Sequence, residues 1–123
     1  NDVAKMMQLY LQKGYYGRKR YFKKETFDKF NKRYYSDKKV RRGLGFDKPQ
    51  LDPEIKATCG CVSDESFGHS GFTGAYTWAA PKSEILYVFL SNRVFPTMEN
   101  TGLVDEDIRT KTQQIIQDAI LPE

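Results

Sequence analysis

Residues 67–74 read Phe67-Gly68-His69-Ser70-Gly71-Phe72-Thr73-Gly74, and the patterns in the rest of the chain are arranged around them. Helical patterns and loops precede this stretch, and two strand patterns and a helical pattern follow it. It contains the only histidine of the chain and three of its nine glycines. Glycine lets a second backbone or a ligand approach closely. The stretch is therefore either the edge of a site or a strand that needs glycine for tight packing.

We expect residues 67–73 to form the first strand. Two further strands are predicted after it, at 74–78 and 85–92. The second of these is the most apolar and is expected to be central. Short turns between the strands imply an antiparallel sheet. A closing helix that ends before Pro122 should cover this sheet with the apolar residues that recur at helical spacing: Ile108, Thr112, Ile115, Ile116, Ala119 and Ile120.

The first half of the chain has a helical pattern. Apolar residues recur at i, i+3, i+4, i+7 and i+8 and predict an amphipathic helix over 2–13: Val3, Met6, Met7, Tyr10 and Leu11. Asn1 or Asp2 can cap its start, and Gly14 suits the C′ position. A turn with a short extended piece is expected at 15–22. A second helix should begin at 23–26, with four residues on one side: Thr26, Phe27, Phe30 and Tyr34.

These patterns predict one α+β domain over 1–123, an antiparallel sheet of three to four strands packed against N- and C-terminal helices. Its helical part is 1–46, its long loop 47–66, and its strands and closing helix occupy 67–123. Gly43-Leu44-Gly45-Phe46, at the end of the helical part, is expected to be a strand. The long loop either lines a substrate cleft or is a surface insertion.

Composition restricts the classes of protein. With 123 residues, 39% of them hydrophobic, the chain can build a modest core, and its many aromatic residues argue against disorder. No apolar run approaches the roughly 20 residues of a membrane span. The net charge is +4, and the basic residues are concentrated between 18 and 42. This region is either a solvated lysine-rich face or a nucleic-acid surface; no nucleic-acid-binding motif supports the second, so nucleic acid is not expected as a partner.

Cys59 and Cys61 form a Cys-x-Cys pair. A disulfide across so short a loop is uncommon, and a metal site would need more ligands than this pair and His69. We therefore expect two free, partly buried thiols. Neither a metal nor a cofactor is predicted.

The triplet His69-Ser70-Gly71, the downstream run Leu86-Tyr87-Val88-Phe89-Leu90-Ser91-Asn92-Arg93 and the upstream 43–46 run together carry a family resemblance. The chain resembles the C-terminal portion of serine β-lactamases and penicillin-binding-protein-like hydrolases, most closely the class-C-like branch. In that family a Lys-Thr-Gly or His-(Ser/Thr)-Gly triplet lies on a strand beside the nucleophile. The resemblance covers essentially the whole chain, but only the last part of the family's chain.

The resemblance implies an acyl-transfer enzyme acting on ester, amide or β-lactam bonds in a bacterial envelope or periplasm. His69 and Ser70 would face the site and assist catalysis. The N–H of Phe72 would donate to the oxyanion, and Gly71 would leave room for the acyl group. From the residues alone, His69 is either such a site residue or a structural or surface histidine.

The family's nucleophile is not found. Only Ser36-Asp37-Lys38-Lys39 fits a Ser-x-x-Lys motif, and it lies in a charged connector, so we interpret it as chance. No tyrosine is followed by Asn two residues later. The nucleophile is then expected upstream of Asn1, in a parent protein that binds a small-molecule or peptide-like substrate. The chain alone should be inactive, and the remainder of the parent domain is its expected partner.

Two other functions remain open. The chain could be a non-catalytic binding or structural module, a degenerate β-lactamase-like domain appended to another envelope enzyme such as a glycoside hydrolase. It could also bind anionic surfaces, with an affinity that falls steeply with salt. An unpaired sheet edge would favour self-association, so a homo-oligomer formed through the sheet is also expected.

Overall fold

The computed structural model describes residues 1–38, 40–52, 54–55 and 58–120. It is an α+β fold, as predicted. Its elements, in chain order, are α1 (Asp2–Leu11), β1 (Tyr15–Tyr16), β2 (Lys19–Arg20), α2 (Lys24–Asn31), the 3-10 turn η1 (Ser36–Lys38), β3 (Phe67–Ser70), β4 (Tyr76–Ala80), β5 (Ile85–Phe89), α3 (Gly102–Asp105) and α4 (Ile108–Ile120). Lys39 of the Ser-x-x-Lys match and Pro122 as the end of the last helix lie outside the described residues.

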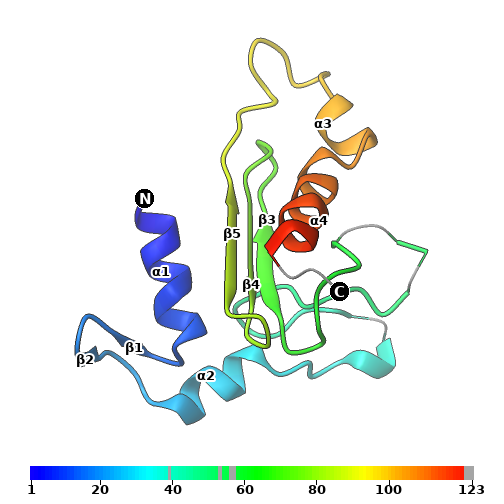
Figure 1. Cartoon of the computed structure of the whole chain (residues 1–123). Helices are drawn as coiled ribbons and strands as arrows, with labels where there is room; N and C mark the ends of the chain where they lie inside the picture. The colour runs from blue at the N-terminus through cyan, green and yellow to red at the C-terminus, as the bar shows by residue number, and fades with distance from the viewer. Residues whose placement is uncertain (39, 53, 56–57, 121–123) are drawn as a thin grey trace.

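The central element is an antiparallel sheet in the order β3-β4-β5, with α1 on one face and α4 on the other (Figure 1). The antiparallel arrangement was predicted, but β4 is central rather than the more apolar β5. In the described chain β5 pairs only with β4. The strand β5 is apolar because both of its faces are covered: Leu86 packs on the α1 face, and Tyr87 is buried on the opposite face.

The core under α1 is mostly aromatic. Met7 of α1, Phe27 of α2, Phe67 and Ala79 are buried together, and five partly buried side chains surround them: Tyr10, Leu11, Phe22, Phe46 and Leu86. The sequence predicted four residues on one side of the second helix, which is α2. Of these four, only Phe27 is buried; Phe30 is exposed, and the helix ends before Tyr34. Burial of this cluster is the main stabilising contribution on this face.

The ends of α1 are capped. The Asn1 side chain accepts a hydrogen bond from the Ala4 N–H, as expected. At the other end the Lys13 N–H donates to Tyr10 O and the Gly14 N–H to Leu9 O, which is the Schellman arrangement. Lys13, with a φ of 51°, therefore occupies the C′ position that we assigned to Gly14. Gly14 comes one residue later, where a Cβ would collide with the Phe22 carbonyl.

The face under α4 is a second aromatic cluster of Tyr76, Trp78 and Tyr87. The Tyr76 hydroxyl donates to Gln113 Oε1 at 3.0 Å, and the Tyr87 hydroxyl donates to the Arg109 carbonyl at 3.1 Å. Burial raises the pKa of both tyrosines, so these hydroxyls stay protonated and act as donors.

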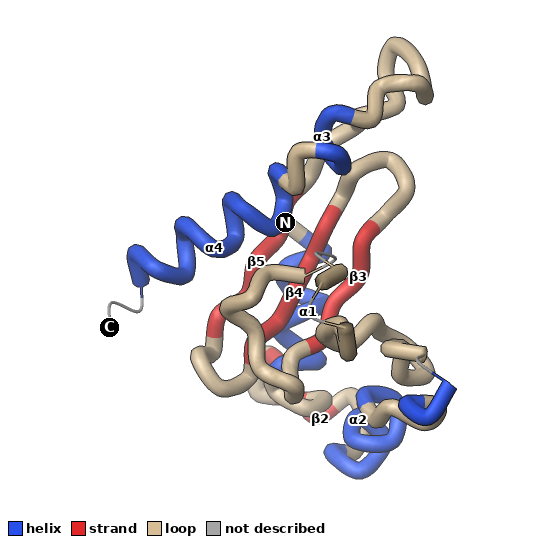
Figure 2. The backbone as a smooth tube through the Cα atoms, turned by 90° about the vertical axis from the view of Figure 1, so that its right-hand side faces the viewer, coloured by secondary structure: helices blue, strands red, loops and turns tan. Residues whose placement is uncertain are grey.

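The prediction that α4 covers the sheet with its apolar residues is therefore wrong. Gln113 and Gln117 are buried against the cluster and the adjoining loop, whereas Ile115 is 69% and Ile120 56% exposed. The tyrosine hydroxyls need acceptors, and glutamine and backbone carbonyls supply them. Figure 2 shows α4 running obliquely to the strands and projecting beyond the sheet. Ile116 is exposed as well, so the three isoleucines after the first turn of α4 are not covered by the sheet. None of the helices in the described chain is long and apolar enough to cross a membrane.

The segment 43–46 is a turn and not the predicted strand. Arg42 and Asp47 on either side of it form an antiparallel bridge, and the Gly43 N–H donates to Phe46 O. The glycines of this segment were predicted to allow a close approach of another backbone. This is confirmed at Gly43, where a Cβ would collide with the Phe30 carbonyl. The short helix α3 was also not predicted, because its single turn is too brief for a periodic pattern.

The cysteines are not free. Cys59 and Cys61 are joined by a disulfide, which corrects the expectation of two thiols. The expectation relied on the rarity of a disulfide across so short a loop. Gly60 and Cys61, however, lie in a turn that brings the two Cα atoms within 5.2 Å, a normal separation for a disulfide.

Candidate functional site

His69 lies on β3, opposite Thr77 of β4, and its side chain faces the α1 side of the sheet. The side chain is 52% exposed. Next to it, the backbone of Asp47 pairs with Gly68 through Asp47 N–H to Gly68 O at 2.8 Å and Gly68 N–H to Asp47 O at 3.0 Å. This short bridge continues the sheet beyond β3 and fixes Asp47 beside His69.

The Asp47 carboxylate is buried beside the guanidinium groups of two arginines and the imidazole of His69. Its side chain is 2% exposed, and its oxygens lie 3.2 Å from Arg41 Nη2, 2.7 Å from Arg42 Nε and 3.5 Å from His69 Nδ1. A carboxylate on this side of the imidazole favours hydrogen on Nδ1 and leaves Nε2 to accept a proton or to bind a ligand. Asp47 thus lies beside the Nδ1 edge of His69, at contact distance rather than in a hydrogen bond.

His69 borders a pocket of about 320 Å³ between α1, the 43–46 turn and β3. Its walls are mostly apolar, with Val3 and Met6 from α1 and Leu44 from the turn, and its polar lining groups include Arg42 and Asp47. An apolar hollow with few polar groups is the usual form of a small-molecule site. Chemically, it can hold an apolar group while His69 and Arg42 contact an anionic or proton-exchanging group.

The structure does not bring Ser70 to this pocket. Ser70 lines a separate cavity of about 150 Å³ on the α4 side, with Tyr76 and Arg109 among its neighbours. Successive residues of a strand point to opposite faces, so the side chains of His69 and Ser70 cannot share one pocket.

Gly71 and Phe72 lie in the turn between β3 and β4. The Gly71 N–H donates to Ala75 O at 2.7 Å. In the described chain the Phe72 N–H makes no hydrogen bond, so it is available to a ligand. A Cβ at Gly71 would lie at ordinary contact distance, 3.5 Å from Ala75 O, so its neighbours in the described chain do not require glycine there.

Arg93, which the sequence did not single out, holds this turn. Its Nε donates to Phe72 O at 2.9 Å, and its guanidinium lies 4.7 Å from the centre of the Phe72 ring. Its Nη1 donates to Asn100 O at 2.9 Å. Arg93 therefore links the turn after β3 to the loop after β5. The only sequence signal was a basic residue directly after the apolar strand.

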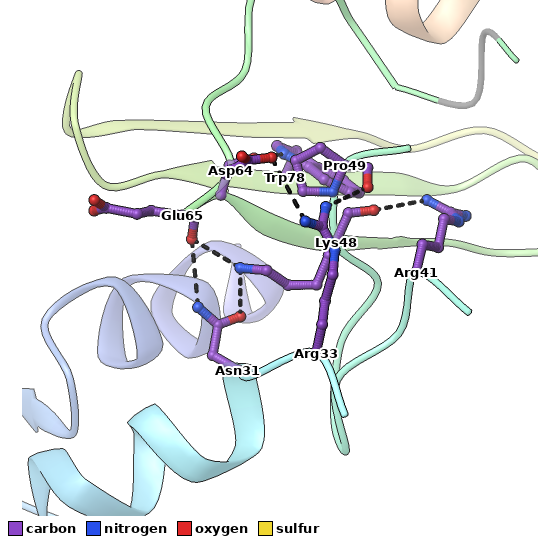
Figure 3. A network of polar contacts seen from close by, with 9 residues as sticks. Asn31, Arg33, Arg41, Lys48, Pro49, Asp64, Glu65 and Trp78 are labelled. Carbon is purple, nitrogen blue, oxygen red and sulfur yellow. Dashed lines mark hydrogen bonds and ion pairs between the residues drawn. The ribbon is translucent and has the colours of Figure 1, made fainter. Parts of the chain in front are cut away.

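A polar network on the other side of the 47–48 segment was also missed (Figure 3). Lys48 is only 4% exposed, and its Nζ donates to Asn31 Oδ1 and to Glu65 O, each at 3.1 Å. Arg33 Nη2 donates to Pro49 O at 2.6 Å. Burial, and to a lesser degree the nearby Arg33 charge, lowers the pKa of Lys48 to about 8. The network anchors the residues after Asp47 between α2 and the loop before β3.

The lowered pKa of Lys48 predicts a pH dependence of stability. Between pH 8 and the ordinary lysine value of 10.5 the unfolded chain binds more protons than the folded chain. The free energy of unfolding should therefore increase as the pH is raised from about 8 to about 9.5, below the range in which the raised pKa values of Tyr76 and Tyr87 oppose the rise. Urea denaturation at pH 7.5, 8.5 and 9.5 would measure this rise, which Lys48→Met should abolish and the matched change of the exposed Lys32 to Met should retain. An equal rise in both variants would contradict the assignment.

Among the described residues, no group of three or more His, Cys, Asp or Glu side chains is placed to hold a metal ion. The arrangement of His69, Asp47 and Arg42 is suited to binding and proton transfer by side chains.

Comparisons with known proteins place the chain among its relatives. No family model matches the chain. It is 31% identical over 101 residues to proteins of Salmonella agona (strain SL483) and Salmonella typhi, each named "Putative D-alanyl-D-alanine carboxypeptidase". Each alignment covers 81% of this chain but 23% of the relative, so the chain spans about a quarter of the length of the curated relatives it matches. It is a distant relative of proteins that carry a peptidase name.

Proposed function

We propose that this chain is part of a serine hydrolase of the penicillin-binding-protein and β-lactamase-like family, to which it contributes the His69-Ser70-Gly71 strand. The similarity to carboxypeptidase-named proteins over 81% of the chain supports the family. The single observation that carries the site is the buried Asp47 carboxylate 3.5 Å from His69 Nδ1, at the edge of an apolar pocket. The parent reaction is acyl transfer from an ester, amide or β-lactam bond to a serine.

The residues of this chain have distinct roles in that proposal. His69, oriented by Asp47, binds the substrate or moves a proton at Nε2. The Phe72 N–H donates to the oxyanion, and Arg93 positions the turn that carries it. Ser70 has no role in the His69 pocket, because its side chain lines the cavity on the opposite face of the sheet. Gly71 leaves room for the acyl group.

The remainder of the parent domain would supply the nucleophile, and the substrate is a small molecule or peptide. A D-alanyl-D-alanine peptide is the substrate class that the relatives' names suggest, and this substrate class supports a location of the parent in the bacterial envelope. In the described chain β5 has no second strand partner, so the rest of the domain, or a second copy of this chain, can pair there.

Acylation tests the proposal. Intact-mass measurement with a fluorophosphonate probe should show labelling of a longer parent protein and none of this chain. In the parent, His69→Ala should slow acylation by about 10²- to 10⁴-fold, the usual contribution of a proton-transferring side chain. The control Lys82→Ala, in the β4–β5 turn, should label normally. Labelling of this chain alone, or an unchanged rate in His69→Ala, would overturn the proposal.

The second candidate is a non-catalytic module that docks on a partner. The exposure of Ile115, Ile120 and Phe95, the last of them 76% exposed, favours it. In the same assay, labelling of neither this chain nor its parent is the result that this candidate predicts.

A further inference from the structure

The disulfide between Cys59 and Cys61 lies where the loop before β3 contacts α4. Cys59 is 4% exposed, and Cys61 is half-buried. Two glutamines of α4 face the two sulfurs individually: Gln114 Oε1 is 3.1 Å from Cys59 Sγ, and Gln117 Oε1 is 3.2 Å from Cys61 Sγ. The pair therefore has a separate amide oxygen for each sulfur.

The orientation of both amides follows from their other hydrogen bonds. Gln114 Nε2 donates to Asp118 Oδ1 at 2.7 Å, and Gln117 Nε2 donates to the Cys61 carbonyl at 3.2 Å. A carboxylate and a carbonyl accept hydrogen bonds and cannot donate them, so each amide must direct its nitrogen there. The oxygens are left facing the sulfurs.

These oxygens need donors that a disulfide cannot provide. Sulfur in a disulfide carries no hydrogen, and within the described residues no N–H or O–H group donates to either oxygen. Gln117 is 5% exposed, so its oxygen has little access to water. In the reduced pair each S–H can donate to its own glutamine. The contacts of the two glutamine oxygens thus suit the dithiol better than the disulfide.

We propose that Cys59 and Cys61 form a reversible dithiol–disulfide pair that exchanges with small-molecule thiols and whose reduced form is held by Gln114 and Gln117. A pocket of about 510 Å³ bordered by Thr58, Cys59, Gly60 and Gln114 gives such a thiol access. The thiolate of an external dithiol attacks one sulfur, and the other leaves with the electron pair and takes up a proton. The second thiol of the dithiol then attacks the mixed disulfide, which releases the cyclic oxidised dithiol and the second cysteine thiol.

The test is an equilibrium titration of the chain with mixtures of reduced and oxidised dithiothreitol. Alkylation and intact mass count the thiols: two alkyl groups mark the reduced pair and none the disulfide. Both states should be populated across the series. Gln114→Met and Gln117→Met should each shift the equilibrium toward the disulfide by about fivefold, the factor that corresponds to one hydrogen bond of ordinary strength.

Gln50→Met is the matched control and should titrate as the native chain does, because Gln50 lines the same pocket but makes no hydrogen bond to either sulfur among the described residues. Gln114 is only partly buried, so its variant keeps the test available if Gln117→Met does not fold. A pair that stays in one state at every dithiothreitol ratio would overturn the proposal. So would equilibria in the two glutamine variants that equal the control.

Discussion

Replacement of Asp47 by asparagine is expected to lower the free energy of unfolding by about 3 kcal/mol, the lower end of the range for removing one partner of a buried ion pair. The change keeps the shape of the side chain and the backbone pairing with Gly68, and removes only the charge. Asp47 is 2% exposed, and Arg41, whose side chain is 20% exposed, would lose its compensating anion. Arg42 is 62% exposed and can turn to water, which keeps the cost from being larger.

Urea denaturation at pH 7 would measure this loss. The matched control is Asp52→Asn, an exposed loop carboxylate whose replacement should change stability by less than about 0.5 kcal/mol. Because His69 is the only histidine, its ring-proton NMR signals can be followed without ambiguity. They should shift in Asp47→Asn and stay in place in Asp52→Asn. Equal stability of the two variants, or an unmoved His69 signal, would show that Asp47 does not hold the site.

The parts of the fold that were predictable are those encoded locally. The helix over Asp2–Leu11 follows from its apolar spacing, and the antiparallel order of the three strands follows from the short turns between them. The closing helix was placed correctly for the same reason. In each case the signal and the structure depend on residues close together in the sequence.

The errors concern what each element packs against. The apolar residues of α4 were assigned to the sheet because burial usually follows hydrophobicity. The sheet face, however, presents the hydroxyls of Tyr76 and Tyr87, and these select Gln113 and a backbone carbonyl of α4. This choice depends on residues about 20 to 40 positions apart, which no periodic pattern can reveal.

The candidate site was likewise predictable only where it depends on residues close together in the sequence. His69 was predictable as the only histidine in a glycine-rich stretch, but Asp47 reaches it only through a long-range pairing with Gly68. Lys48 and its network depend on the same pairing. The separation of Ser70 from His69, by contrast, follows from strand alternation and was open to prediction from the sequence.

Gly68→Ala should be as damaging as the loss of the Asp47 charge, at a cost of about 3 kcal/mol or more, because it overpacks a core that has no room. A Cβ at Gly68 would collide with the Thr77 carbonyl oxygen and with the ring of Trp78. Neither can move easily: Thr77 belongs to the central strand, and Trp78 is 1% exposed, with its Nε1 donating to Ser66 Oγ at 2.9 Å.

The substitution should also displace Asp47 from His69, because the backbone of Gly68 holds Asp47 beside His69. Gly68→Ala is therefore expected both to unfold at lower urea concentration and to shift the His69 ring signals. Gly60→Ala is the matched control: a Cβ there meets no atom within 4 Å, so stability and signals should be nearly unchanged. If the two variants unfolded at the same urea concentration, tight packing would not be the reason for glycine at residue 68. The strand would then tolerate a side chain there, and the backbone bridge between Asp47 and residue 68 would not depend on glycine.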